Sequence, residues 1–409
     1  MTLSNHNTPF RVLLTISVAI LFCVLAWQFL QQSNAVMAIK AKSNTMLVSA
    51  AQSGAVNAPA AVAPATFDRA IHARPLDVAT VNAGVYAKAI GRPKPYQMQA
   101  SDVAVLQAMG WRYTPALQNL AVAAIASQDV TQLIGISDAL LRREELVREA
   151  TLLINAAEIF PQGQAVIVEK LKLEPLWRTP YLKAVADLRQ PQQVVARARL
   201  LEMLGATDTP ATVEEIAPAL KLLVDNQRVP LAYRLWSTSL RVKPAKIQDG
   251  NFAAAYSRQS AGLEERETLP FEWSFPSGSG FWSELVSAGG KRQELMIHWD
   301  GRGVPVFASQ QLWLQSGVRS MVIEGSDLNS ATFSRLGFSL RCPQGSVRLV
   351  RQGAATAKKA TFVIDQEPAC DGPVFEMNGL PKDYNSGFDR FRTSGGEEIV
   401  FTIGSIRLQ

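Results

Sequence analysis

Glu294-Leu295-Met296-Ile297-His298-Trp299-Asp300 gives the C-terminal half of this chain its strand character. Leu295, Ile297 and Trp299 fall on one side of an extended chain, and the polar residues at the alternate positions fall on the other. Residues 335–342, Arg-Leu-Gly-Phe-Ser-Leu-Arg-Cys, alternate in the same way. Such alternation gives a strand one buried face and one wet face, which is typical of an antiparallel sheet.

Further strands are expected on both sides of this stretch, because turn signals such as Gly289-Gly290 and Asp300-Gly301 separate short apolar runs. Near the C-terminus the apolar side slips by one residue, so we expect a β-bulge at Gly404. Many short antiparallel strands predict a β-sandwich of jelly-roll type over residues 244–409. Strands are predicted near residues 271–275, 280–287, 293–300, 305–315, 318–325, 335–342, 346–351, 360–365, 373–377 and 398–408.

The preceding part of the chain has the helical period instead. Its best-defined helix is predicted at residues 141–160, where Leu146, Ala150 and Leu153 share one face. Short connections between helices predict a helical, repeat-like domain of stacked hairpins over residues 101–243. The expected fold class is therefore α+β with several domains. The other helices are predicted near residues 101–109, 115–127, 164–173, 179–189, 192–204, 212–224 and 228–240.

The N-terminal part carries an unbroken apolar run at residues 12–30. Its length is about what a bilayer core requires of a helix, roughly 20 residues, so we expect a single transmembrane anchor. Arg11 and the amino terminus would keep residues 1–11 in the cytoplasm by the positive-inside rule. A cleaved signal peptide is the alternative, with small residues at 33–35 and 36–38 as cutting sites. Residues 31–100, rich in Ala and Pro, are expected to be a flexible linker.

Cysteine usage agrees with export from the cytoplasm under either interpretation. Cys23 lies in the apolar run, which leaves Cys342 and Cys370 in the exported part. Two exported cysteines in one β domain predict a structural disulfide, with two separate buried thiols as the alternative. The formal net charge of +6 comes without a basic run, so no nucleic-acid partner is expected.

Two sets of motifs carry a resemblance to known families. Residues 249–252, Asp-Gly-Asn-Phe, with residues 269–273, Leu-Pro-Phe-Glu-Trp, and residues 310–317, Gln-Gln-Leu-Trp-Leu-Gln-Ser-Gly, resemble strands of jelly-roll carbohydrate-binding modules. The chain from about Ser101 onward also resembles bacterial membrane-anchored proteins associated with exopolysaccharide production, which have a degenerate tetratricopeptide-like segment. Residues 140–143, Leu-Leu-Arg-Arg, and residues 175–178, Pro-Leu-Trp-Arg, with Tyr181-Leu182 following, carry that likeness. The resemblance implies a single-pass protein of the bacterial inner membrane, with the bulk of the chain in the periplasm.

No catalytic or metal-binding signature accompanies these motifs. The chain has three histidines, His6, His72 and His298, and lacks the nucleophile-elbow, HExxH and CxxC patterns. A glycosidase needs only two carboxylates across a cleft, for which Glu284, Glu294 and Asp300 beside His298 are the candidates. Such residues also occur on any solvated strand face, so we expect no enzyme. No cofactor or metal is expected, because Ala253 stands where the carbohydrate-binding modules have a Glu that often binds structural calcium.

A glycan site needs exposed aromatic rings with amide or carboxylate groups beside them. The alternation of residues 310–315 places Gln311, Trp313 and Gln315 on the outward side, and Trp282 lies in a Gly/Ser-rich approach. These four residues are the predicted glycan-binding residues. The alternative is that Trp313 packs under a loop or against the helical domain. Trp273 and Trp299 are predicted to be core residues.

The leading functional hypothesis is a non-enzymatic accessory protein of exopolysaccharide biosynthesis or export. It would bind glycan or scaffold the assembly machinery, with polysaccharide or envelope assembly proteins as partners. A protein–protein scaffold of an envelope complex, without glycan binding, is the second hypothesis. A weak carbohydrate-active hydrolase is the third.

Overall fold

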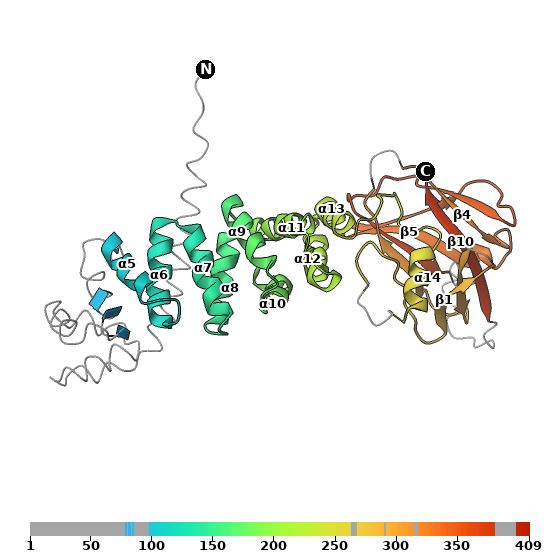
Figure 1. The fold of residues 1–409 in the computed structure, drawn as a ribbon. Coiled ribbons are helices and arrows are strands. Elements are labelled where there is room, and N and C mark those ends of the chain that lie inside the picture. The colour runs from blue at the N-terminus through green and yellow to red at the C-terminus, as the bar shows by residue number, and fades with distance from the viewer. Residues whose placement is uncertain are drawn as a thin grey trace, which may run out of the picture. The chain divides into compact units, whose positions relative to one another are not determined.

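The protein is described by a computed structural model covering residues 78–79, 81–82, 84–85, 98–262, 268–289, 292–314, 318–380 and 398–409. Helices come first and two antiparallel sheets follow in the C-terminal region (Figure 1), so the α+β class is confirmed. The anchor predicted at residues 12–30 lies outside the described residues. Within the described ranges, no helix is both long and apolar enough to cross a membrane.

The chain divides into two compact units, residues 1–181 and 182–409. Among its described residues, the second unit holds four further α-helices together with both sheets, whereas the sequence placed the division at residues 243/244. In the first unit the helices follow one another with short turns (Figure 1). They are α5 (Ala100–Ala108), α6 (Thr114–Ser127), α7 (Val130–Leu141), α8 (Val147–Ala157), α9 (Pro161–Leu171) and the start of α10 (Arg178–Lys183).

The single helix predicted at residues 141–160 is wrong. Glu144 and Leu146 take positive φ values of 55° and 47°, which a right-handed helix does not admit, and the chain turns there. Helix α7 ends before this turn and α8 begins after it. Asp129 caps α7 by accepting a hydrogen bond from the Gln132 amide at 2.9 Å, an N-cap signal that the sequence analysis missed.

A buried carboxylate connects the helices of the first unit. Asp138 on α7 accepts a hydrogen bond from Nε1 of Trp177 at 2.9 Å and one from Nε of Arg142 at 2.8 Å. Nζ of Lys170 on α9 lies 3.2 Å from its other oxygen. Three donors compensate the desolvation of this carboxylate, so Asp138 fixes the α9–α10 turn against α7.

The helices of the second unit begin with clear sequence signals. A reciprocal capping box between Thr212 and Glu215 starts α12, and proline occupies the first turn of α11 and α13. Residues 249–252 do not form the first strand that the resemblance implied. Phe252 has φ of 59°, and the Asp249 carboxylate accepts hydrogen bonds from the amides of Ala254 and Ala255, which starts a helix instead. The elements are η3 (Val185–Asp187), α11 (Pro191–Gly205), α12 (Val213–Asp225), α13 (Val229–Ser239) and α14 (Ala253–Ser260).

Both sheets are antiparallel, and the predicted strands match them closely from residue 280 onward. The six-stranded sheet has the order β1-β2-β10-β4-β8-β7, and the four-stranded sheet has the order β3-β9-β5-β6. The bulge predicted at Gly404 is confirmed, because the register of β10 with β4 shifts between Ile403 and Ser405. The strands are β1 (Phe281–Ser287), β2 (Gln293–Trp299), β3 (Val306–Gln311), β4 (Ser320–Ser326), β5 (Leu336–Cys342), β6 (Gly345–Arg348), β7 (Val350–Arg351), β8 (Lys359–Val363), β9 (Val374–Gly379) and β10 (Ile399–Leu408).

The inner faces of the two sheets share one apolar core. Trp273 and Trp299 are both buried in it, as predicted. Trp299 also donates from Nε1 to the carbonyl oxygen of Arg302 at 2.8 Å, which satisfies its polar atom. The predicted strand at residues 271–275 is reduced to one bridge between Ser274 and Ser309.

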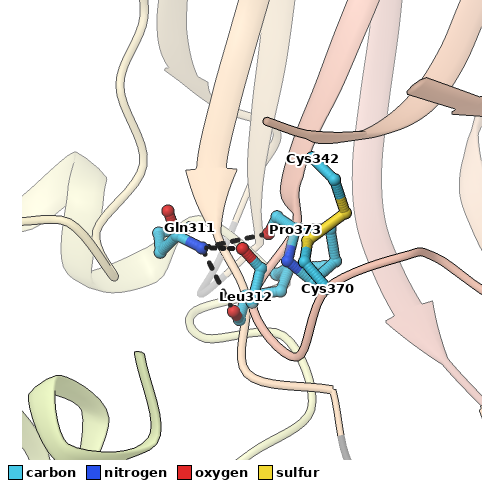
Figure 2. Close-up of a disulfide and its surroundings, with 6 residues drawn as sticks. Gln311, Leu312, Cys342, Cys370 and Pro373 are labelled. Carbon is cyan, nitrogen blue, oxygen red and sulfur yellow. Dashed lines mark hydrogen bonds between the residues drawn. A yellow bond between two sulfur atoms is a disulfide. The ribbon is translucent and has the colours of Figure 1, made fainter. Parts of the chain in front are cut away.

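The predicted disulfide is confirmed. The sulfur atoms of Cys342 and Cys370 lie 2.03 Å apart, and the two cysteines are separated by 28 positions in sequence (Figure 2). Cys342 ends β5, and Cys370 lies in the loop that leads into β9. The bond therefore holds this loop against the four-stranded sheet.

Candidate functional site

The outer side of β3 is covered, although the alternation correctly placed Gln311 on it. Gln311 is only 8% exposed. Its Nε2 donates to the carbonyl oxygens of Gly372 at 2.6 Å and Pro373 at 3.3 Å, and lies 3.4 Å from that of Leu312 (Figure 2). The prediction that Gln311 binds a ligand is therefore wrong, because its amide is used to hold the disulfide-linked loop.

Trp313 packs against a helix of the same unit. Its ring centroid lies 4.9 Å from that of Tyr233 on α13, at an interplanar angle of 45°. Phe271 and Trp236 surround the same tyrosine at 5.1 Å and 5.8 Å. Half-burial in this aromatic cluster corresponds to the alternative interpretation, in which Trp313 packs against the helices. Gln315 lies outside the described residues.

Polar contacts also tie α13 to the sheets. The Tyr233 hydroxyl donates to the carbonyl oxygen of Ala245 and accepts a hydrogen bond from Nε2 of Gln248. The Gln248 backbone in turn exchanges two hydrogen bonds with the Gln310 side chain, at 3.0 Å and 3.1 Å. We call this set of contacts around Tyr233, with Gln311 and Trp313, the aromatic joint.

The outer face of the six-stranded sheet leaves one tryptophan open. Trp282 on β1 is paired in register with His298 on β2, and both side chains point away from the core. The two rings stack with centroids 4.4 Å apart and an interplanar angle of 6°. Trp282 nevertheless remains 47% exposed, so a ring surface is presented to solvent with the imidazole as its backing.

Two carboxylates flank the imidazole of His298. Nδ1 lies 3.0 Å from Oε1 of Glu398, and Nε2 lies 3.3 Å from Oε1 of Glu284. Only a doubly protonated imidazolium can donate to both carboxylates at once, because the neutral ring has a single N–H. The side chain of His298 is 15% exposed, whereas that of Glu284 is about half exposed and that of Glu398 is mostly exposed. Trp282, Glu284, His298 and Glu398 form what we call the Trp282 platform.

Strand pairing brings this platform together from three places in the sequence. Trp282 and Glu284 alternate on β1, His298 comes from its hairpin partner β2, and Glu398 immediately precedes β10 on the other side of β2. The sequence predicts Trp282 as a glycan-binding residue, but its local pattern does not pair Trp282 with His298. The hairpin signal at Gly289-Gly290 could have supplied that pairing, whereas Glu398 could not be placed without knowing that β10 lies next to β2.

The platform offers chemistry suited to a sugar. The C–H groups of a pyranose stack on an aromatic ring, and carboxylate oxygens beside the ring accept hydrogen bonds from its hydroxyls. A ring fixed by stacking is pre-organised, so less rotamer entropy is lost on binding. Among the described residues, no cluster of His, Cys, Asp and Glu is arranged to hold a metal ion.

Comparison with known proteins gives no independent indication of function. No protein-family model matches the chain, and no curated protein matches it either.

Proposed function

We propose that this chain is a glycan-binding accessory protein that uses the Trp282 platform to hold a polysaccharide. The single observation that carries the proposal is the half-exposed Trp282 ring, stacked on His298 between two carboxylates. The alternative is a surface tryptophan without a function. Such a residue would not require a coplanar imidazole whose two nitrogens are both held by glutamates. The carboxylates favour neutral or amine-bearing sugars over uronic acids, because like charges repel.

The proposal continues with the sequence-based expectations. A jelly-roll carbohydrate-binding-like domain would be held at the periplasmic side of a bacterial inner membrane by the anchor at residues 12–30. It would serve exopolysaccharide biosynthesis or export there without catalysing a reaction. Of the carboxylates predicted for a hydrolase, Glu284 contacts the His298 imidazole on a sheet face, as Glu398 also does, and we assign both glutamates to binding.

Affinity electrophoresis of the full-length protein tests glycan binding. Gels would contain a neutral glucan, a partly de-N-acetylated glucosamine polymer or a polyuronate. We expect retardation by the first two, and a loss of about tenfold in affinity for Trp282→Ala, the size of one lost stacking contact. Trp111→Ala is the matched control, because Trp111 is exposed to a similar extent outside the sheets. Absence of retardation by all three polymers would refute the proposal.

A second candidate function, scaffolding, has one observation of its own. Leu173 and Leu176 lie in the turn between α9 and α10, and Leu176 is 90% exposed. Exposed leucines three positions apart in one turn are compatible with an apolar patch for a partner protein. Chemical crosslinking to partner proteins in cells, lost in Leu173→Ser with Leu176→Ser but retained in Trp282→Ala, would favour scaffolding over glycan binding.

A further inference from the structure

A cavity of about 350 Å³ opens between the two sheets, at the side where the chain crosses from β6 to β7 through Leu349. Its size lies at the lower end of the range for small-molecule sites, about 300–1,000 Å³. Phe338 of β5 faces Phe362 of β8 across the cavity wall, with ring centroids 4.7 Å apart, and Phe333 lies within 6.5 Å of both. Leu336 and Leu349 complete a buried apolar lining.

An arginine enters this apolar space from the edge of the six-stranded sheet. Arg351 on β7 is directly paired with Phe362, whose side chain points into the core, so both side chains lie on the inner side of the sheet. Nε of Arg351 is buried, and within the part of the chain that the structure describes it has no hydrogen-bond partner. Arg348 lines the same cavity from β6, and no carboxylate is among the described residues that line it.

Apolar walls and a guanidinium whose buried Nε has no partner among the described residues favour two different properties in one ligand. The walls favour a hydrocarbon body, because they remove apolar surface from water. The guanidinium favours a carboxylate, which accepts two parallel hydrogen bonds from its planar fork. We propose that this cavity binds an acyl-chain carboxylate, with the chain against the three phenylalanines and the carboxylate on Arg351.

Arg351 also has a simpler explanation. Inward-pointing charges on edge strands prevent sheets from pairing edge to edge, and β7 is an edge strand. Edge protection requires neither a cavity nor a ligand, and it predicts self-association when the charge is removed. The two explanations therefore differ in what the wild-type protein binds.

Titration calorimetry of the full-length protein with decanoate, and separately with decanol, tests the site. We expect saturable decanoate binding at least about tenfold tighter than decanol, the difference that a charge-assisted contact supplies. Arg351→Gln should reduce decanoate binding to the level of decanol, and Arg351→Lys should lie between, because it keeps the charge but loses the fork. Lys359→Gln is the control, since it removes one exposed positive charge from the neighbouring strand β8.

Three results would overturn the proposal: no binding of decanoate, equal binding of decanoate and decanol, or unchanged binding in Arg351→Gln. Self-association of Arg351→Gln, seen by sedimentation without decanoate binding by the wild type, would assign Arg351 to edge protection. Because the cavity does not include Trp282, Trp282→Ala should leave decanoate binding unchanged. Failure of this proposal is thereby distinguished from failure of glycan binding.

Discussion

Trp282 lies on β1 and Trp313 lies two residues beyond the end of β3, and the sequence predicts both as glycan-binding residues. The structure gives them opposite surroundings. Trp313 packs against Tyr233 in the aromatic joint, whereas Trp282 stacks on His298 and remains nearly half exposed. Alternation therefore identifies the outer face of a sheet, but it does not reveal whether another element covers that face.

The largest loss of stability is expected from a substitution beside Trp313, where α13 covers the ring. Tyr233→Ala removes a ring that is 3% exposed, together with the hydroxyl that holds Gln248 and Ala245. We expect the free energy of unfolding of the second unit to fall by about 3–5 kcal/mol, the range for buried large aromatics. Urea denaturation followed by circular dichroism measures it. A loss below about 1 kcal/mol would mean that the aromatic joint does not stabilise this unit.

The disulfide stabilises the loop that covers Gln311 on β3. Replacing Cys342→Ser together with Cys370→Ser opens a covalent link across 28 positions of sequence. It also frees the loop before β9, in which Gly372 follows Cys370 and accepts a hydrogen bond from the Gln311 amide. Chain entropy predicts a loss of about 3.5 kcal/mol. Reductant should lower the urea midpoint of the wild type to that of the double variant, and should leave the double variant itself unchanged. A wild-type midpoint that ignores reductant would contradict the prediction.

Close packing of Gly372 against α13 predicts a smaller loss. A Cβ atom at Gly372 would lie 2.4 Å from a methyl carbon of Val229, closer than real contacts allow. Gly372→Ala should therefore cost about 1–3 kcal/mol, as overpacking does. In a double-mutant cycle, Val229→Ala should recover part of that loss, because it removes the two clashing methyl groups but keeps the Cβ atom, which lies 2.5 Å from the added one. Simple additivity of the two substitutions would show that the loop moves away without cost.

Asp249 lies in the segment between the aromatic joint and α14. It makes the stability of the second unit depend on pH. Burial raises the pKa of its carboxyl above the ordinary value, although the amides of Ala254 and Ala255 act in the opposite direction. The folded state therefore binds this proton more tightly than the unfolded chain. Its contribution to stability is greatest below the unfolded pKa, near 4, and declines as pH rises through the raised folded value. Asp249→Asn should abolish that decline in urea midpoints measured across this pH window, and an unchanged slope would assign it to another group.

Local patterns predicted much of the second unit. Nine of the ten predicted strand ranges overlap named strands. The bulge at Gly404 followed from the one-residue shift of the apolar side near the C-terminus. The disulfide followed from the presence of two cysteines in the exported part. Contacts across long sequence separations were not predictable in this way. Gln311 is buried by residues 61 and 62 positions away, and His298 meets Glu398 across 100. The helix at α14 was missed because Asp249 caps it through side-chain bonds that a strand-like motif concealed.

The smallest effect on stability is expected at the open tryptophan, where the effect on binding should be largest. Trp282→Ala removes a ring from a solvated sheet face and should change the free energy of unfolding by only about 0.5 kcal/mol. His298→Ala removes the backing of the ring and the contacts to both glutamates. It should weaken glycan retardation less than Trp282→Ala does, because the stacking ring itself remains. If His298→Ala abolished retardation while Trp282→Ala did not, the imidazole and not the indole would be the sugar-contacting group. Equal stability losses in Trp282→Ala and Tyr233→Ala would remove the distinction between an open platform and a packed joint.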